Sequence, residues 1–350
     1  MRLNLPLSII VTERYILVKT CICYYRCMEN GKEITSDIVV LTGSSNPELA
    51  GKVAKRLWTK AYPVISRFAD NEVDADIPIS VRGKKVFIIQ STVPPLVDSH
   101  YFELFAMVDA AQSHSAESVH IVMPYYGYAR QDKPDDRRSA VMGMLITDIF
   151  KLLEVNHVIT VDIHSEALAG AKRRLPWDNL SARKYLLKAV AAEGVKDILM
   201  TSPDDGGVKR TTKYSRTSGN SDEMALLAKY RNSKVKDETK VTNLIGDVED
   251  RNCLLVDDII STAGTLANGA DFLMERGAKS VRGAATHAVF SGNALEKIEN
   301  SALEKVFITD SLPVREEVRN HPKIKVVSIA ELLGDAILSH LNKDTLVGEK

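Results

Sequence analysis

Short apolar runs alternate with longer amphipathic stretches along most of the chain. Val86–Gln90, Val119–Met123 and Val158–Val161 are mostly apolar and short, which is typical of buried strands. Asp98–Ser113 and Ala140–Leu153 lie between them and carry apolar residues at helical spacing. Regular alternation of this kind predicts an α/β fold with mainly parallel sheets.

The same alternation continues into the second half, which indicates two similar halves. Ala116–His120 resembles Ala278–Arg282, and Val158–Asp162 resembles Val306–Asp310, so each half has a similar entry into a strand. Further strands are expected at Ile38–Leu41, Ile198–Thr201, Cys253–Val256, Val281–Ala285 and Val306–Ile308, and further helices at 46–58, Thr265–Arg276 and Ile329–Leu341.

Length and charge narrow the class of protein. The 350 residues suggest about two domains. Lys plus Arg and Asp plus Glu are each 46, so the formal net charge is zero, which disfavours a nucleic-acid-binding module. No apolar stretch approaches the roughly 18 residues of a membrane span. We therefore expect a globular protein that binds neither nucleic acid nor membrane.

The first residues have a different character from the rest. Arg2, Arg14, Lys19 and Arg26 outnumber the acidic residues up to Glu29, as they do in organelle transit peptides. A cytoplasmic location is expected, and organelle targeting by residues 1–35 stays an open alternative.

The strongest chemical signal lies in residues 253–265. An apolar run leads into Asp257 and Asp258, and a hydroxyl-rich loop with Gly264 then begins a helix. Ligands of open α/β sheets bind at the carboxyl ends of strands, and the N–H groups of a helix N-terminus suit a phosphate. Two carboxylates can hold sugar hydroxyls or a hydrated Mg²⁺. The run therefore predicts a phosphate site beside two carboxylates that can hold either a sugar or a hydrated Mg²⁺.

This run resembles the phosphoribosyl-diphosphate-binding motif of type I phosphoribosyltransferases. From about Val40 to Leu341 the chain resembles ribose-phosphate diphosphokinases, also called phosphoribosyl-pyrophosphate synthetases. The resemblance rests on segments in a fixed order: TGSSNPELA (42–50), FADNE (68–72), SVRGKKVFIIQST (80–92), PYYGYARQDK (124–133), TVDIH (160–164), SPDDGGVKR (202–210), IGDV (245–248) and ATHAVFSG (285–292).

The resemblance implies two phosphoribosyltransferase-like domains and a Mg²⁺-dependent transferase of nucleotide biosynthesis. The β,γ-diphosphoryl group of ATP would pass to the 1-hydroxyl of ribose 5-phosphate, giving phosphoribosyl diphosphate and AMP. It also implies a homo-oligomer built from dimers, often a hexamer. The domain limits we expect are an N-terminal extension at 1–36, an ATP-side domain at 37–180, a ribose-5-phosphate-side domain at 181–328, and a C-terminal helix and tail at 329–350 that packs on the first domain.

Site residues follow from the same resemblance, position by position. ATP contacts are implied for Phe68, Asp70, Glu72, Arg130, Gln131 and Asp135, with the first three reaching adenine from a neighbouring subunit. Ribose-5-phosphate contacts are implied for Asp257, Asp258, Ser261, Thr262, Ala263, Gly264 and Thr265. His164 and Asp204 match ligands of the ATP-bound metal. Lys229 and Arg231 match the catalytic cations that stabilise the transferring group.

Several positions depart from the family pattern. Ser261 stands where Asp is usual, Asp205 replaces a small residue, and Ser165–Leu168 and Pro134–Val141 differ from the usual sequences. These departures leave open a non-catalytic associated subunit of the same family. A transferase that consumes phosphoribosyl diphosphate is a further alternative, but it would need no adenine site. Because Lys229, Arg231 and both aspartates are present, we favour the active enzyme.

Overall fold

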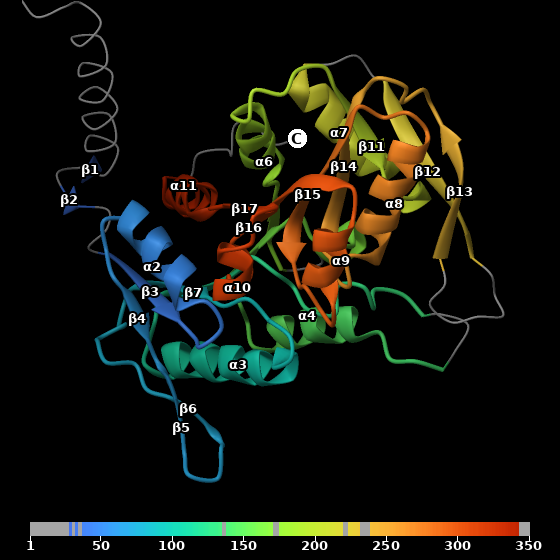
Figure 1. Ribbon diagram of the computed structural model, residues 1–350. Helices are drawn as coiled ribbons and strands as arrows, with labels where there is room; N and C mark the ends of the chain where they lie inside the picture. The colour runs from blue at the N-terminus through green and yellow to red at the C-terminus, as the bar shows by residue number, and fades with distance from the viewer. Residues whose placement is uncertain are drawn as a thin grey trace, which may run out of the picture.

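Two mainly parallel sheets, each flanked by helices, form the body of the molecule (Figure 1). The computed structural model describes residues 28–29, 32–33, 37–134, 138–170, 175–219, 223–231 and 239–342. The predicted α/β class with parallel-sheet cores is confirmed. Among the described residues, no helix is both long and apolar enough to cross a membrane.

The first sheet has the order β10-β9-β8-β7-β3-β4, and every neighbouring pair in it is parallel. Its strands are β3 (Ile38–Thr42), β4 (Ala61–Pro63), β7 (Lys85–Ile89), β8 (Ser118–Met123), β9 (His157–Val161) and β10 (Trp177–Leu180). The helices of this part are α2 (Pro47–Arg56), α3 (Val97–Ser113), α4 (Met142–Leu152) and α5 (Glu166–Gly170). A short pair, β1 (Met28–Glu29) and β2 (Lys32–Glu33), precedes them.

The second sheet has the order β13-β12-β11-β14-β15-β16-β17, and only its edge pair β12–β13 is antiparallel. Its strands are β11 (Ile198–Ser202), β12 (Met224–Arg231), β13 (Thr239–Ile245), β14 (Asn252–Ile260), β15 (Ser280–Ala288), β16 (Leu303–Thr309) and β17 (Ile324–Val327). Its helices are α6 (Arg183–Ala191), η2 (Asp205–Gly207), α7 (Val208–Ser218), α8 (Gly264–Glu275), α9 (Ala294–Asn300) and α10 (Glu316–Arg319).

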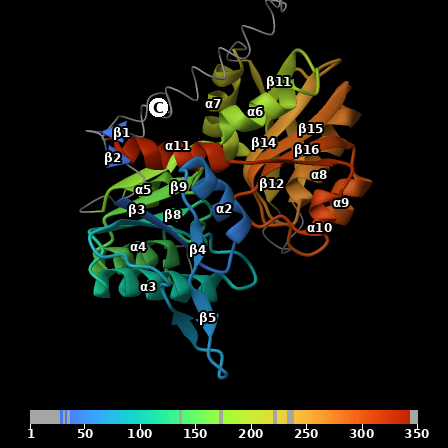
Figure 2. The same ribbon diagram turned by 90° about the vertical axis from the view of Figure 1, so that its left-hand side faces the viewer.

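The last helix, α11 (Ala330–Leu341), packs beside α2 over the first sheet (Figure 2). Leu333 and Ile337 are fully buried there, and Arg56 of α2 pairs with Asp335 at 2.5 Å. Gly334 permits the close approach, because a side-chain carbon at that position would lie 2.4 Å from Arg56 Cγ. The C-terminal helix therefore joins the core that β3, β7 and β9 build.

At two strands the structure differs from the sequence-based expectation. Strand β14 continues to Ile260, so Asp257 and Asp258 lie inside the strand and not after it. Trp177–Leu180 forms an edge strand that the sequence analysis did not predict, since a short strand beside charged residues gives a weak signal. Residues 1–36 lie almost wholly outside the described residues, and the domain limits stay predictions.

A two-stranded hairpin projects from the first sheet (Figure 2). It consists of β5 (Ile65–Arg67) and β6 (Val73–Ala75), with residues 68–72 at its tip. Arg67 anchors it to α3, where its Nη2 lies 2.8 Å from Oε1 of the buried Glu103. The tip itself is exposed.

Candidate functional site

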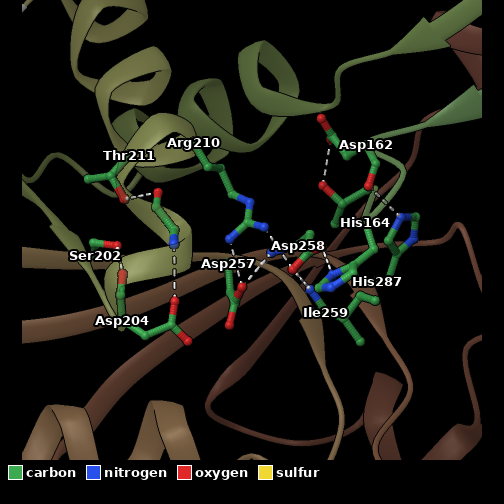
Figure 3. A network of polar contacts seen from close by, with 12 residues as sticks. Asp162, His164, Ser202, Asp204, Arg210, Thr211, Asp257, Asp258, Ile259 and His287 are labelled. Atoms are coloured by element: carbon green, nitrogen blue, oxygen red, sulfur yellow. Dashed lines mark hydrogen bonds and ion pairs between the residues drawn. The ribbon is translucent and has the colours of Figure 1, made fainter. Parts of the chain in front are cut away.

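Two adjacent carboxylates on β14 form the centre of the candidate site (Figure 3). We call Asp257 and Asp258 the acidic pair. Arg210 on α7 bridges them, with Nη1 2.8 Å from Asp257 Oδ1 and Nη2 2.9 Å from Asp258 Oδ1. One guanidinium thus holds both carboxylates in one orientation, as its planar fork allows.

The pKa values of the two aspartates shift in opposite directions. Burial, followed by the charge of Asp258, raises the pKa of Asp257 above its ordinary value. For Asp258, burial acts to raise the pKa, but His164 and Arg210 outweigh it, so the pKa falls below its ordinary range. Two charged carboxylates this close are tolerated only because cations face them.

His164 lies on the other side of Asp258. Its Nδ1 is 2.6 Å from Asp258 Oδ2, and this hydrogen bond raises the pKa of His164 against the opposing effect of burial. Because Nδ1 faces the carboxylate, only Nε2 remains to contact a ligand. The predicted residue therefore joins the acidic pair, although it follows a strand of the other sheet.

Asp204 stands at the start of α7, on the far side of Arg210 from His164 (Figure 3). Its Oδ1 accepts a hydrogen bond from Gly207 N at 3.0 Å and caps the short helix η2. A side-chain carbon at Gly207 would lie 3.5 Å from Arg210 Nη1 and 3.6 Å from Asp204 Oδ1. Asp204 and His164 thus lie on either side of the acidic pair (Figure 3).

The loop Ser261–Thr265, which we call the phosphate loop, turns from β14 into α8. Ala263 has φ of 58° and precedes the first residue of α8, so the chain reverses sharply there. The turn directs backbone N–H groups of the helix N-terminus to the end of the sheet, where an anion is favoured. A side-chain carbon placed at Gly264 would lie 3.8 Å from Lys297 Nζ. This lysine of α9 therefore brings a positive charge next to the phosphate loop.

Two sheets meet behind the acidic pair through a polar contact that the sequence did not reveal. Asp162, after β9, accepts hydrogen bonds from Ala182 N at 2.9 Å and from Thr286 Oγ1 at 2.7 Å. His287 of β15 is fully buried, with Nε2 2.9 Å from Val161 O. These contacts fix His164 relative to β14.

Arg210 is another residue that sequence reasoning missed. It ends the segment SPDDGGVKR, but a charge on a helix gives no sign of its partner. The partner lies on β14, and only the parallel pairing of β11 with β14 brings them together.

The predicted ATP-side residues divide into two places. Arg130 and Gln131 are exposed after β8. Asp258 raises the pKa of His164, and Arg130 lies close enough to that histidine for its charge to oppose part of this rise. Next to them, Asp132 accepts a hydrogen bond from Ser165 Oγ at 2.5 Å. This loop therefore borders the acidic pair. Asp135 lies outside the described residues.

Phe68, Asp70 and Glu72 lie at the tip of the β5–β6 hairpin, apart from the acidic pair. Phe68 is 57% exposed, and its N–H donates to Glu72 O at 3.0 Å, which closes the tip. Asp70 Oδ1 accepts from Glu72 N. An exposed aromatic ring on a projecting hairpin is available to a second molecule.

Lys229 and Arg231 lie on β12, next to the antiparallel edge strand β13. The backbone pairs Lys229 with Val241 and Arg231 with Thr239, after an irregularity at Ala228/Lys229. The side chains of both residues lie outside what the structure describes.

Comparisons with known proteins point to the same family in both halves of the chain. A family model described as the N-terminal domain of ribose phosphate pyrophosphokinase matches residues 38–153, and one described as the phosphoribosyl synthetase-associated domain matches residues 198–347. The ribose-phosphate pyrophosphokinase of Vibrio vulnificus strain YJ016 is 39% identical over 312 residues, covering 89% of this chain and 98% of that protein. The enzyme of the same name from Oceanobacillus iheyensis is 38% identical over 305 residues, covering 87% of this chain and 94% of that protein.

A solved structure is similar over nearly the same span. The phosphoribosylpyrophosphate synthetase of Mycobacterium smegmatis superposes with a TM-score of 0.80 at 32% identity, covering 88% of this chain and 99% of that one. The region that the second family model matches, residues 198–347, includes the acidic pair and the phosphate loop.

Proposed function

The chain belongs to the ribose-phosphate pyrophosphokinase family, and on that premise we propose that it transfers the β,γ-diphosphoryl group of ATP to the 1-hydroxyl of ribose 5-phosphate. The products are 5-phosphoribosyl 1-diphosphate and AMP. The observation that carries this proposal is the acidic pair on β14 placed directly before the phosphate loop.

In this proposal ribose 5-phosphate lies along the end of β14. Ser261–Thr265 hold the 5-phosphate with backbone N–H groups and hydroxyls, and Lys297 offsets its charge. Asp257 and Asp258 accept hydrogen bonds from the ribose hydroxyls, which fixes the 1-hydroxyl toward ATP. Positioning of this kind accounts for much of the acceleration in phosphoryl-type transfers.

The donor set around the acidic pair fits a hard cation. Carboxylate oxygens of Asp204, Asp257 and Asp258 are the ligands Mg²⁺ prefers, and His164 offers Nε2 beside them. Mg²⁺ bound with ATP would offset charge on the phosphates and polarise the transferring group. Arg210 pairs with both carboxylates and so keeps the acidic pair organised.

Lys229 and Arg231 are proposed to act on the transferring diphosphoryl group. They lie on the β12–β13 edge pair of the second sheet. Cations at that position stabilise negative charge that spreads over the phosphate oxygens during transfer.

Assembly and location complete the proposal. The projecting hairpin with Phe68, Asp70 and Glu72 supports a homo-oligomer, dimers assembled to a hexamer, in which the tip meets adenine in a neighbouring copy. The proposed location is cytoplasmic. The proposed domain limits are 37–180 and 181–328, with 329–350 returning to the first domain.

Production of AMP is the direct test of the activity. The purified chain, mixed with Mg²⁺, ATP and ribose 5-phosphate, is expected to release AMP that depends on both Mg²⁺ and ribose 5-phosphate. Nucleotides are separated by chromatography, and ATP without ribose 5-phosphate is the control. Folded protein that binds ATP but makes no AMP would favour the associated subunit.

Replacing Phe68 with alanine is expected to raise KM for ATP about tenfold and to change kcat little. Loss of one aromatic stacking face costs about 1–1.5 kcal/mol, which matches that factor. Steady-state kinetics with varied ATP measure it, and Phe102→Ala, at an exposed phenylalanine of α3, is the matched control. An unchanged KM for Phe68→Ala would remove the hairpin from the ATP site.

A further inference from the structure

Three histidines that the transfer does not use meet between the first sheet and the last helix. His120 lies on β8 and His157 on β9, and the two residues are direct neighbours in the parallel register. His340 is in the last turn of α11, which packs over that face of the sheet (Figure 2). One potential ligand atom from each residue lies within 4.8 Å of the other two. We call these residues the three-histidine cluster.

Side-chain alternation explains why the two strand histidines face α11. Residues two apart on a strand share a face, so His120 lies on the side of Val122, and His157 on the side of Ile159 and Val161. Those apolar residues belong to the core that α11 completes. His120 and His157 are therefore buried, at 4% and 5% exposure, whereas His340 remains partly accessible.

The two buried rings carry nitrogen atoms without partners. Among the described residues, neither His120 Nδ1 nor His157 Nδ1 has a hydrogen-bond partner, although both atoms are shielded from solvent. An unsatisfied buried polar atom costs about 1–3 kcal/mol, and two side by side are unusual in one cluster. A ligand that accepts electron pairs from both nitrogens would offset this cost.

The other ring nitrogen, Nε2, of each buried histidine has a polar partner. His157 Nε2 lies 3.1 Å from Asp178 Oδ2, and His120 Nε2 lies 2.8 Å from Ser118 Oγ. A carboxylate or hydroxyl on one ring nitrogen is the usual support for a histidine that binds metal through its other nitrogen. The Nδ1 atom of each buried ring is thereby left for a ligand.

We propose that His120, His157 and His340 bind one zinc-class transition-metal ion, at a site separate from the acidic pair. Three imidazoles with a fourth position at the accessible side of His340 suit Zn²⁺, whereas Mg²⁺ prefers oxygen ligands. Tetrahedral bonds of about 2.1 Å place nitrogens roughly 3.4 Å apart. The rings of His157 and His340 stack at an interplanar angle of 15°, so binding requires the partly accessible His340 ring to rotate until one of its nitrogens points at the ion. The ion ties the C-terminal helix to β8 and β9.

The surrounding charges permit such an ion. Lys85 is near enough to act on His120 and His340, and the carboxylate of Asp178 acts on His340 and bonds to His157. Burial, with help from the neighbouring rings and Lys85, lowers the pKa of His120 to about 3.

Zinc titration of the full chain tests this site. Protein stripped with a chelator is titrated with Zn²⁺ against a chromogenic indicator, with Mg²⁺ in excess to occupy oxygen sites. The wild type and His114→Gln, a control at an exposed histidine of another surface, are expected to bind one Zn²⁺ per chain with the same affinity. His340→Gln is expected to bind that equivalent at least about 100-fold more weakly. Equal affinity in the wild type and His340→Gln, or no zinc binding in the wild type, would overturn the proposal.

A second variant keeps the test decisive if His340→Gln misfolds. Asp178→Asn retains all three ligands and removes the charge of the group that orients His157, so the zinc affinity should fall about 10- to 100-fold. Bound Co²⁺ reports the geometry through its visible absorption, and Zn²⁺ should raise Tm of the wild type more than Tm of either variant. An unchanged zinc affinity in folded Asp178→Asn contradicts the proposed orientation.

Discussion

Replacing Asp258 with asparagine is expected to lower kcat/KM for ribose 5-phosphate by at least about 100-fold. This side chain contacts both Arg210 and His164, and it is 6% exposed, so its charge acts in a poorly screened place. The amide keeps the shape but loses the charge that both cations face. A 100-fold loss corresponds to about 2.7 kcal/mol of transition-state stabilisation, which is typical of a buried charged contact.

Steady-state kinetics with varied ribose 5-phosphate measure this effect. Asp109→Asn makes the same change on the exposed face of α3 and should leave kcat/KM unchanged. Circular dichroism and Tm establish that each variant is folded, because loss of one of the two carboxylates that pair with Arg210 also destabilises the protein. A folded Asp258→Asn protein with wild-type kinetics would contradict the role of the acidic pair.

The sequence located the acidic pair because its signal is local. Asp257, Asp258 and the phosphate loop lie in one continuous run, and a strand that leads into a hydroxyl-rich helix start has a physical meaning without tertiary contacts. The parallel α/β class followed in the same way from the spacing of apolar residues. These properties depend on neighbours in the chain.

Contacts between distant segments could not be predicted in this way. Arg210 lies on a helix and its partners on a strand, and nothing in the charge of one residue reports the other. The three-histidine cluster is more extreme, since its members come from β8, β9 and α11. The sequence contains each histidine as an isolated residue, and only the register of β8 with β9 makes two of them neighbours.

Replacing Lys229 with alanine is expected to lower kcat by at least about 100-fold while the dissociation constant of ATP changes less than about threefold. The reason is differential binding. A cation that faces charge developing on the diphosphoryl group stabilises the transition state more than the bound ATP, and its loss appears in kcat. Lys229 lies on β12, beside the edge strand β13, so its backbone belongs to the same sheet as the acidic pair.

Lys325→Ala is the matched control, because it removes a lysine from β17 at the opposite edge of that sheet. It should leave both constants unchanged. Arg231→Lys keeps the neighbouring charge but removes the planar fork, so it should lose less activity than Arg231→Ala if charge dominates. Weaker ATP binding by Lys229→Ala with full turnover at saturating ATP would show that the lysine serves ground-state binding, because an interaction made equally in both states raises KM and leaves kcat intact.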